Sequence, residues 1–299
     1  MGDTGDRAVV TKKASGTYRV AVCQFGPVFL NKEANLEKME NMARRAALDG
    51  ARLVVFPECC VTGYGTGNHV REMARLAEVT IGPGKGEAVR RMEALARELD
   101  VYLVFGLPER VDEITYNSAV YVRPDAGVVG LAHKLHLWDA DAEVFASGQG
   151  FAVWDGPLGR VGSLVCYDLE FPEAGRSLAL MGAHLLAVTT ANMRPWEEFQ
   201  RVYVRARAME NSLFVALCNC IGRSDTTEFF GGSIIVDPYG HILAEAGDAE
   251  AVLVADIDLD LIDKATRDLD YIRKRREDLY GWTCSPSAGT NALPPRKAP

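Results

Sequence analysis

The chain has 299 residues, a length that fits one large domain or two of ordinary size. Hydrophobic residues make up 48% of it and charged residues 25%, which excludes a wholly disordered or fibrous protein and indicates a globular one with a sizeable core. With 33 Lys and Arg against 41 Asp and Glu, the net charge of -8 lacks the concentrated positive field that binding a phosphate backbone requires, so we expect no nucleic-acid partner.

The seven cysteines are too few and too irregularly spaced for a disulfide scaffold, and an odd number cannot all pair within one chain. They therefore indicate mostly reduced thiols. Residues 1–16 are polar, without the apolar centre or cleavage site of a secretory signal, and no apolar run is long enough to cross a bilayer. We expect a cytoplasmic protein with no membrane partner.

Strand and helix patterns alternate from Tyr18 onward. In residues 18–25, Val20, Val22 and Gln24 alternate with Ala21, Cys23 and Phe25, which is a strand pattern. Residues 32–48 carry apolar side chains at helical spacing, with Asn31 as a candidate N-cap. The run at residues 53–56 is short, continuously apolar and followed by proline, which is typical of a strand buried on both faces.

The alternation continues to residue 256. Strands are predicted over residues 101–105, 116–122, 128–133, 161–165, 184–189, 212–217, 232–236 and 251–256, and helices over residues 86–99, 172–181 and 196–210. This order predicts an α/β or α+β fold in which helices cover sheets. Because neither an internal repeat nor a flexible linker divides the chain, we predict one domain over residues 17–282, with a flexible N-terminus at 1–16 and a disordered tail at 283–299.

Three chemically capable side chains follow predicted strands. Glu58 comes after the apolar run 53–56, Lys134 ends the strand at 128–133, and Cys166 ends the strand at 161–165. Each also has a structural explanation: a loop charge for the glutamate, a snorkelling side chain for the lysine, and a buried thiol for the cysteine. The ends of strands are nevertheless frequent positions for catalytic groups.

Cys166 departs from the pattern of a structural thiol. A helix signalled by Pro172 begins only a few residues later, so the cysteine occupies a tight turn between strand and helix. Such a turn directs a side chain and the neighbouring backbone N–H groups toward one point. A nucleophile and part of an oxyanion hole could share that point.

Three segments carry a family resemblance: Phe56-Pro57-Glu58, His133-Lys134-Leu135, and Cys166-Tyr167-Asp168 followed by Phe171-Pro172-Glu173. In their order and spacing they closely resemble the nitrilase superfamily, the carbon–nitrogen hydrolases with a Glu-Lys-Cys triad. The resemblance extends from Tyr18 to Trp282. It implies a four-layer α-β-β-α sandwich and association into a homodimer or a higher homo-oligomer.

The resemblance also implies a chemistry for these residues. Glu58 is expected to act as the general base, Cys166 as the nucleophile that forms a thioester, and Lys134 with the backbone N–H of Tyr167 as the oxyanion donors. Glu143 is expected to be the second glutamate that many amidase-like members carry shortly after the lysine. No step calls for a metal, a nucleotide or a redox cofactor.

The expected substrate is a small carboxamide, because Cys-Tyr-Asp resembles the amidase branch more than true nitrilases. Its side chain should be selected by residues just beyond predicted strand ends. Aromatic members of this set suggest an apolar acyl group, whereas Arg194 either binds a carboxylate or forms a surface ion pair. The expected substrate-binding residues are Tyr64, Trp138, Phe145, Asn192, Met193, Arg194 and Trp196.

Other functions remain open from sequence. Hydrolysis of N-carbamoyl amino acids or β-ureido acids is the second choice, followed by nitrile hydrolysis. An inactive scaffold of the same fold is the non-enzymatic alternative. A papain-like pairing of Cys166 with His133 is disfavoured because His133 and Lys134 should lie on opposite faces of the strand. Cys218 and Cys220 lack the second ligand pair of a zinc site and are expected in the core.

Overall fold

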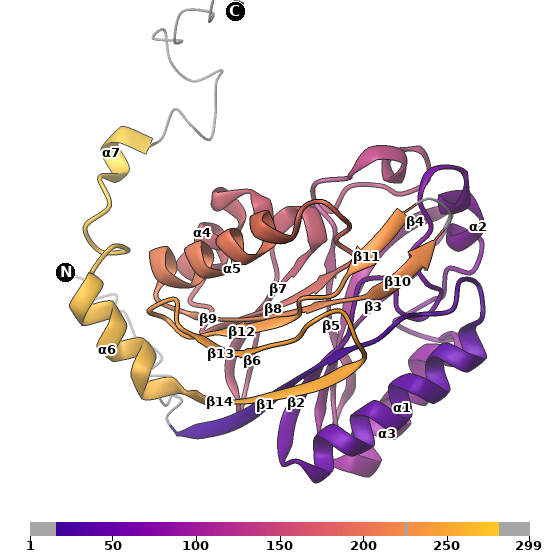
Figure 1. Ribbon diagram of the computed structural model, residues 1–299, viewed down its shortest axis with the longest axis horizontal. Helices are drawn as coiled ribbons and strands as arrows, with labels where there is room; N and C mark the ends of the chain where they lie inside the picture. The colour runs from indigo at the N-terminus through magenta and orange to yellow at the C-terminus, as the bar shows by residue number, and fades with distance from the viewer. Residues whose placement is uncertain (1–15, 225–226, 281–299) are drawn as a thin grey trace, which may run out of the picture.

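Two six-stranded sheets lie face to face between helices in the computed structural model, which describes residues 16–224 and 227–280 (Figure 1). The predicted four-layer α-β-β-α sandwich is confirmed. The first sheet has the order β14 (Ala251–Asp258), β1 (Thr17–Gln24), β2 (Ala51–Val55), β3 (Tyr102–Val111), β4 (Ile114–Arg123) and β5 (Gly127–His133). The second has the order β13 (Ile242–Glu245), β12 (Ile234–Val236), β9 (Phe214–Asn219), β8 (Leu185–Thr190), β7 (Gly159–Val165) and β6 (Val153–Gly156).

Helices cover the outer face of each sheet. The first sheet packs against α1 (Lys32–Leu48) and α3 (Glu87–Leu99), and the second against α4 (Pro172–Leu180) and α5 (Glu197–Asn211), as Figure 1 shows. The observed bounds of α1 coincide with the predicted ones. The side chain of Asn31 accepts a hydrogen bond from the N–H of Ala34 and satisfies one of the free donors of the first turn.

Three apolar clusters fill the spaces between the four layers. One joins α1 and α3 to the first sheet, one lies between the two sheets, and one joins α4 and α5 to the second sheet. The strands β2 and β8 are almost wholly buried, which explains why their sequences are nearly continuous apolar runs. A fourth, smaller cluster packs beneath the loops at one edge of the sandwich.

Strand direction gathers the predicted catalytic residues at one edge. In the first sheet β1, β2 and β3 are parallel, and β5 runs the same way as β3 because both are antiparallel to β4. In the second sheet β7, β8 and β9 are parallel. Glu58 and Cys166 therefore follow the carboxyl ends of parallel strands, where open α/β sheets place their sites, and Lys134 follows the carboxyl end of β5, which runs in the same direction as β2.

Sequence patterns missed several short or peripheral elements. These are η1 (Gly67–His69), α2 (Val70–Ala74), the edge strands β6 and β13, the hairpin of β10 (Ile221–Ser224) and β11 (Thr227–Phe230), α6 (Leu259–Leu269) and α7 (Glu277–Tyr280). Most have too few residues to show a period. The flexible N-terminus, apart from residue 16, and the disordered tail predicted at 283–299 lie outside the described residues.

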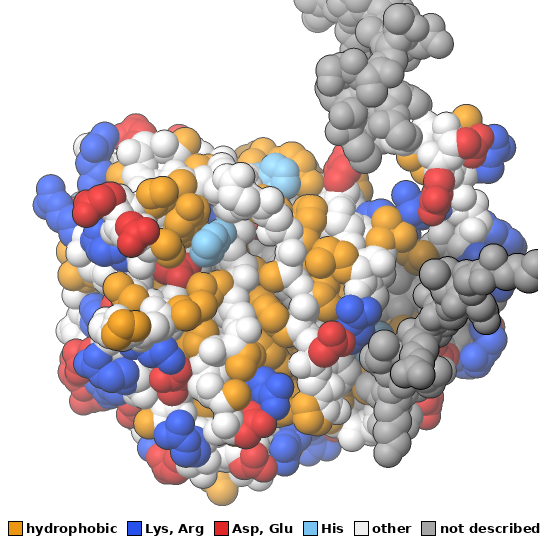
Figure 2. Space-filling model, turned by 180° about the vertical axis from the view of Figure 1, so that it is seen from behind, with side chains coloured by type: hydrophobic (Ala, Val, Ile, Leu, Met, Phe, Trp, Pro, Cys, Tyr) orange, Lys and Arg blue, Asp and Glu red, His pale blue; other side chains and the backbone are white. Residues whose placement is uncertain are grey.

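The face of the molecule drawn in Figure 2 has no broad area of a single charge. Figure 2 shows Lys and Arg interspersed with Asp and Glu on the face opposite to that of Figure 1, with apolar side chains between them. In the described part of the chain, no helix combines the length and the apolar character that a membrane span needs.

Candidate active site

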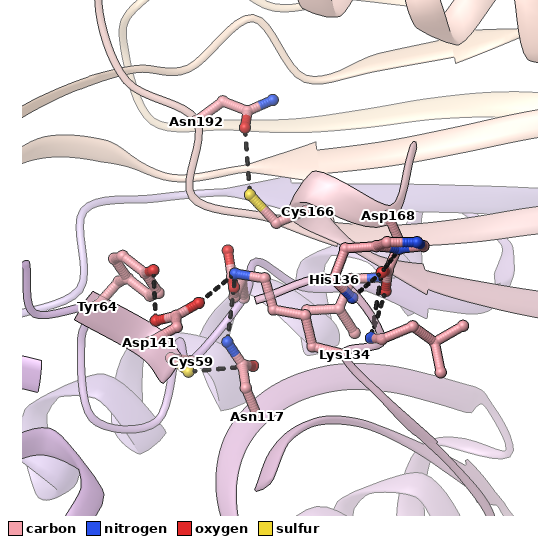
Figure 3. A network of polar contacts seen from close by, with 12 residues as sticks. Cys59, Tyr64, Asn117, Lys134, His136, Asp141, Cys166, Asp168 and Asn192 are labelled. Atoms are coloured by element: carbon pink, nitrogen blue, oxygen red, sulfur yellow. Dashed lines mark hydrogen bonds and ion pairs between the residues drawn. The ribbon is translucent and has the colours of Figure 1, made fainter. Parts of the chain in front are cut away.

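Cys166 stands at a sharp turn between β7 and the 3₁₀ turn η3 (Cys166–Glu170). Its φ of +49° lies in the left-handed region, which non-glycine residues rarely adopt and which recurs at functional sites. The thiol is half-buried, and its Sγ donates a hydrogen bond to Oδ1 of Asn192 at 3.2 Å (Figure 3). The predicted turn between strand and helix is thus present around Cys166.

Asn192 is itself held from two sides. Its backbone N–H donates to Oδ1 of Asn219 at 2.8 Å, and its Nδ2 donates to Oε1 of Gln200 at 2.9 Å. These contacts join the end of β8 to β9 and α5. The oxygen that faces the Cys166 thiol is therefore fixed by the second sheet and its covering helix.

Glu58 lies at the junction between the two sheets. Its backbone N–H donates to the carbonyl of Thr190, at the end of β8, at 3.4 Å. Space here is so limited that a Cβ at Gly106 on β3 would lie 2.6 Å from the Cα of Glu58 and 2.4 Å from the N of Cys59. Only glycine at position 106 allows the backbone of β3 to lie this close to the backbone of Glu58 and Cys59.

Lys134 connects two buried carboxylates. Its Nζ donates to Oε1 of Glu58 at 2.9 Å and to Oδ2 of Asp141 at 2.6 Å, and all three side chains are at most 1% exposed. Nδ2 of Asn117 donates to the same oxygen of Glu58 at 2.7 Å, and the hydroxyl of Tyr64 donates to Oδ1 of Asp141 at 2.8 Å. Figure 3 shows this continuous polar network.

The surroundings shift the pKa values of all three predicted triad residues. Burial raises the pKa of Glu58, and the positive charge of Lys134 only partly opposes that shift. Burial and the neighbouring Glu58 both raise the pKa of the Cys166 thiol. Burial alone would lower the pKa of Lys134, but Glu58, Tyr64 and Asp141 outweigh it and raise that pKa. The site thus combines a neutral thiol, a carboxylate of increased basicity and a lysine that stays cationic.

A cavity of about 260 Å³ opens over Cys166 and Lys134. Five of the seven expected substrate-binding residues line it. They are Tyr64, Trp138, Asn192, Met193 and Trp196. The remaining lining residues are Tyr167, Glu170, Ala191, Phe199 and Tyr203, so the walls are largely aromatic.

Phe145 and Arg194 do not line this cavity, so the structure gives no support to the expectation that they contact substrate. Phe145 is buried in the apolar cluster beneath the loops, where it supports the site from behind. Arg194 points to the surface and forms ion pairs with Glu197 and Glu228. Of its two predicted roles, the surface ion pair is the one observed.

Glu143 also lies outside the site. Its side chain is 56% exposed and pairs with Arg71, whereas Asp141 occupies the position beside Lys134. The two acids belong to the 3₁₀ turn η2 (Asp139–Glu143), in which each residue turns by about 120°. Residues two apart therefore point in different directions. The turn has only five residues, too few to show a period that would have distinguished Asp141 from Glu143 in the sequence.

The sequence analysis also missed four neighbours of the site: Phe199, Tyr203, Glu170 and Asn117. Phe199 and Tyr203 lie on α5 one turn apart and line the same wall of the cavity, a placement that helical spacing from Trp196 allows. Glu170 lies four residues after Cys166. Asn117 lies on β4 and reaches Glu58 only through tertiary contact, so no local pattern identifies it.

Asp168 connects the segment that follows Lys134 with the turn at Cys166. Its buried carboxylate accepts hydrogen bonds from the N–H groups of Leu135 at 3.1 Å, His136 at 2.8 Å and Val165 at 3.3 Å. His136 also contacts it through Nδ1 at 2.8 Å and stacks on Phe171. One side chain thus fixes the segment after Lys134 against the segment before Cys166.

Cys218, Cys220 and His133 take structural positions. Cys218 and Cys220 are buried, and among the residues the structure describes no cluster of His, Cys, Asp and Glu could hold a metal ion. His133 contacts Glu109 through Nε2 at 2.8 Å and stacks on Tyr116. This arrangement gives no support to a pairing of His133 with Cys166.

Comparison with known proteins gives matches across most of the chain. The model of the carbon–nitrogen hydrolase family matches residues 19–267. An (R)-stereoselective amidase from Pseudomonas sp. is 38% identical over 250 residues, which cover 83% of this chain and 87% of that protein.

Solved structures match the fold as well. The crystal structure of an amidase from Nesterenkonia sp. aligns with a TM-score of 0.77 and 28% identity over 91% of this chain and 97% of the other. A variant of that amidase, aligned with the same TM-score and identity over 90% and 97% of the two chains, carries the acetamide moiety of fluoroacetamide covalently on its active-site cysteine.

Proposed function

Because the chain belongs to the carbon–nitrogen hydrolase family, we propose that it hydrolyses a small carboxamide to a carboxylic acid and ammonia through a thioester on Cys166. The observation that carries this proposal is the convergence of Glu58, Lys134 and Cys166 beside one aromatic cavity. The family alone leaves the choice of C–N bond open. The amidase names of the matched proteins favour a carboxamide.

In the first half-reaction, the thiol proton of Cys166 passes to Glu58 while sulfur attacks the amide carbonyl. Oε2 of Glu58 is buried and has no hydrogen-bond partner among the described residues, so it can accept that proton. Collapse of the tetrahedral intermediate breaks the C–N bond. Glu58 then delivers the proton to the departing nitrogen, which leaves as ammonia.

Negative charge on the substrate oxygen is stabilised by Lys134. Its ammonium group has three donors, of which Glu58 and Asp141 use two, and its side chain lines the cavity. The third donor is therefore assigned to the oxyanion, together with the backbone N–H of Tyr167. Such donors act strongly because they are fixed in place before the reaction.

In the second half-reaction, water attacks the thioester after giving one proton to Glu58. The C–S bond breaks, the carboxylic acid leaves, and the proton returns to sulfur. Glu58 thus serves twice as base and twice as acid. A raised pKa suits both roles, because proton transfer in either direction is easiest when the pKa lies near the working pH.

The test uses purified protein with a panel of carboxamides, ureido acids and nitriles, with ammonia, carbon dioxide and the mass of the protein followed together. A carboxamidase releases ammonia without carbon dioxide and shows an acyl adduct on Cys166 under rapid acid quench. Cys166→Ala should retain the fold and lose all turnover, whereas Cys23→Ala, at a buried position, should retain the chemistry.

The opposing outcomes are equally specific. Stoichiometric carbon dioxide from ureido acids would replace the carboxamidase proposal with ureido-acid hydrolysis. Turnover of nitriles alone would replace it with a nitrilase. Full amidase activity in Cys166→Ala would remove the covalent mechanism, and the absence of turnover and adduct across the panel would leave an inactive scaffold.

A further inference from the structure

The wall of the cavity beyond Cys166 is formed by aromatic rings from α5 and η3. Trp196 and Phe199 meet edge to face with ring centroids 5.2 Å apart, and Phe199 meets Tyr203 at 6.1 Å. Tyr167 completes this wall from the cysteine turn. Rings of this kind present negative faces as well as apolar area, so they can contact a cation as well as a hydrocarbon.

Glu170 places a carboxylate in this aromatic wall. It is half-buried, and it is the one acidic residue among the described residues that line the cavity. Lys134 is the one lysine or arginine in that lining, and it is already bound to Glu58 and Asp141. Among the described residues, the carboxylate of Glu170 has neither an ion pair nor a hydrogen bond.

The guanidinium of Arg207 lies beside Glu170 but forms no ion pair with its carboxylate. Arg207 donates through Nη2 to the backbone carbonyl of Glu170 at 2.9 Å, through Nε to the carbonyl of Leu169 at 2.9 Å, and through Nη1 to Glu210 at 2.9 Å. It holds the backbone of η3 and faces another carboxylate. Burial raises the pKa of Glu170, and Arg207 opposes this shift only in part. A charge partner for Glu170 is thus missing within the cavity wall.

We propose that the cavity selects carboxamides whose acyl chain carries a cationic group, with Glu170 as its counter-charge and the rings of Trp196, Phe199 and Tyr203 as its walls. This inference rests on the proposed amide hydrolysis and adds the substrate class to it. A bound ammonium group would satisfy the carboxylate that burial disfavours and contact the faces of the rings. An acyl chain ending in a carboxylate would meet Glu170 as a like charge.

The test compares two amides of the same shape and different charge, 4-(trimethylammonio)butanamide and 5,5-dimethylhexanamide. Glu170→Gln keeps the size of the side chain and removes its charge. Glu198→Gln is the matched control, because Glu198 is an exposed glutamate in the first turn of α5 and does not line the cavity. The ratio of kcat/KM for the cationic amide to that for the neutral amide is measured in each protein.

We expect Glu170→Gln to lower this ratio about tenfold by reducing kcat/KM for the cationic amide, while Glu198→Gln leaves it within about twofold. Calorimetric binding of both amides to Cys166→Ala, with and without Glu170→Gln, gives a second readout that needs no turnover. The same tenfold loss of affinity for the cationic amide is expected there.

The outcomes separate this inference from the proposed function. If amides are hydrolysed but the ratio is the same in the wild type and in Glu170→Gln, the substrate class is wrong and the hydrolysis stands. If no amide is turned over while Cys166→Ala binds the cation through Glu170, the hydrolysis is wrong and the cation site stands. Equal binding of the two amides by Cys166→Ala would overturn the inference independently of turnover.

Discussion

At the scale of single residues, Asp141 and Glu143 form a natural pair for comparison. Asp141 is 1% exposed and bound to Lys134, and Glu143 is 56% exposed and bound to Arg71. Asp141→Asn should misplace Lys134 and lower kcat on the order of 100-fold, the cost of losing one oxyanion donor. KM should change little. Steady-state kinetics with circular dichroism as a folding check measures this.

Glu143→Gln is the control for Asp141→Asn, and it should keep kcat within about twofold because the exposed pair with Arg71 contributes little. A large loss in Glu143→Gln with normal kinetics in Asp141→Asn would contradict the assignment. A loss of folding in Asp141→Asn would be visible in the spectrum. In that case Asp141→Glu, which keeps the charge, should restore part of kcat.

The raised pKa of Glu58 predicts a pH dependence. The base form is the carboxylate, so kcat/KM should rise with pH through the pKa of Glu58, with a midpoint above the ordinary value of 4.5. Asn117 donates to that carboxylate and favours its charged form. Asn117→Ala should therefore move the midpoint to still higher pH, while Asn41→Ala on the exposed side of α1 should not. A midpoint at or below 4.5 would argue against Glu58 as the base.

At the scale of elements, Asp168 is expected to stabilise the joint between the loop after β5 and the turn η3. Its carboxylate accepts from three backbone N–H groups, on Leu135, His136 and Val165. Asp168→Asn leaves fewer acceptors for these buried donors and should lower the free energy of unfolding by about 1–3 kcal/mol. Urea denaturation measures this directly.

Asp139→Asn serves as the comparison for Asp168→Asn. Asp139 is exposed and has a φ of +47°, a conformation that asparagine tolerates well. The free energy of unfolding of the Asp139→Asn protein should therefore differ from that of the wild type by less than about 0.5 kcal/mol. Equal effects of the two substitutions would show that Asp168 does not hold the joint. A loss of kcat in Asp168→Asn beyond its loss of stability would show that the joint also positions Lys134 and Cys166.

Elements with a strong period were predictable from sequence, and the contacts between elements were not. The bounds of α1 follow from its apolar spacing and from Asn31, and the buried strand β2 follows from its continuous apolar run. The inward position of Asp141 depends on a 3₁₀ turn, whose three-residue period is shorter than the α-helical one. The contact of Cys166 with Asn192 joins two strand ends through packing, which no local pattern encodes.

At the scale of the whole molecule, the sandwich divides the site between its halves. The first sheet supplies Glu58 and Lys134, and the second supplies Cys166 with Asn192. The apolar layer between the sheets therefore fixes the distance between base and nucleophile. Phe199 of α5 and its N-cap residue Trp196 line the cavity. The helix itself runs along the outer layer of the sandwich (Figure 1).

Large apolar side chains are exposed among charged ones at the start and on the outer side of α5, and we propose that this side mediates the self-association that the family resemblance implies. Trp196 is 49% exposed, Phe199 50% and Val202 54%, an unusual concentration of large apolar side chains on one charged helix. A second copy that covers this face would remove apolar surface from water and narrow the mouth of the cavity. We therefore expect sedimentation velocity at micromolar concentration to show a dimer or a larger assembly.

Val202→Glu should shift that equilibrium toward the monomer, because an interface that buries Val202 would bury an unpaired charge in the variant. Leu48→Glu is the control, since Leu48 is 84% exposed at the end of α1, on the opposite outer layer of the sandwich. It should sediment like the wild type. If the wild type is monomeric, or if Leu48→Glu dissociates the assembly and Val202→Glu does not, α5 is not the interface.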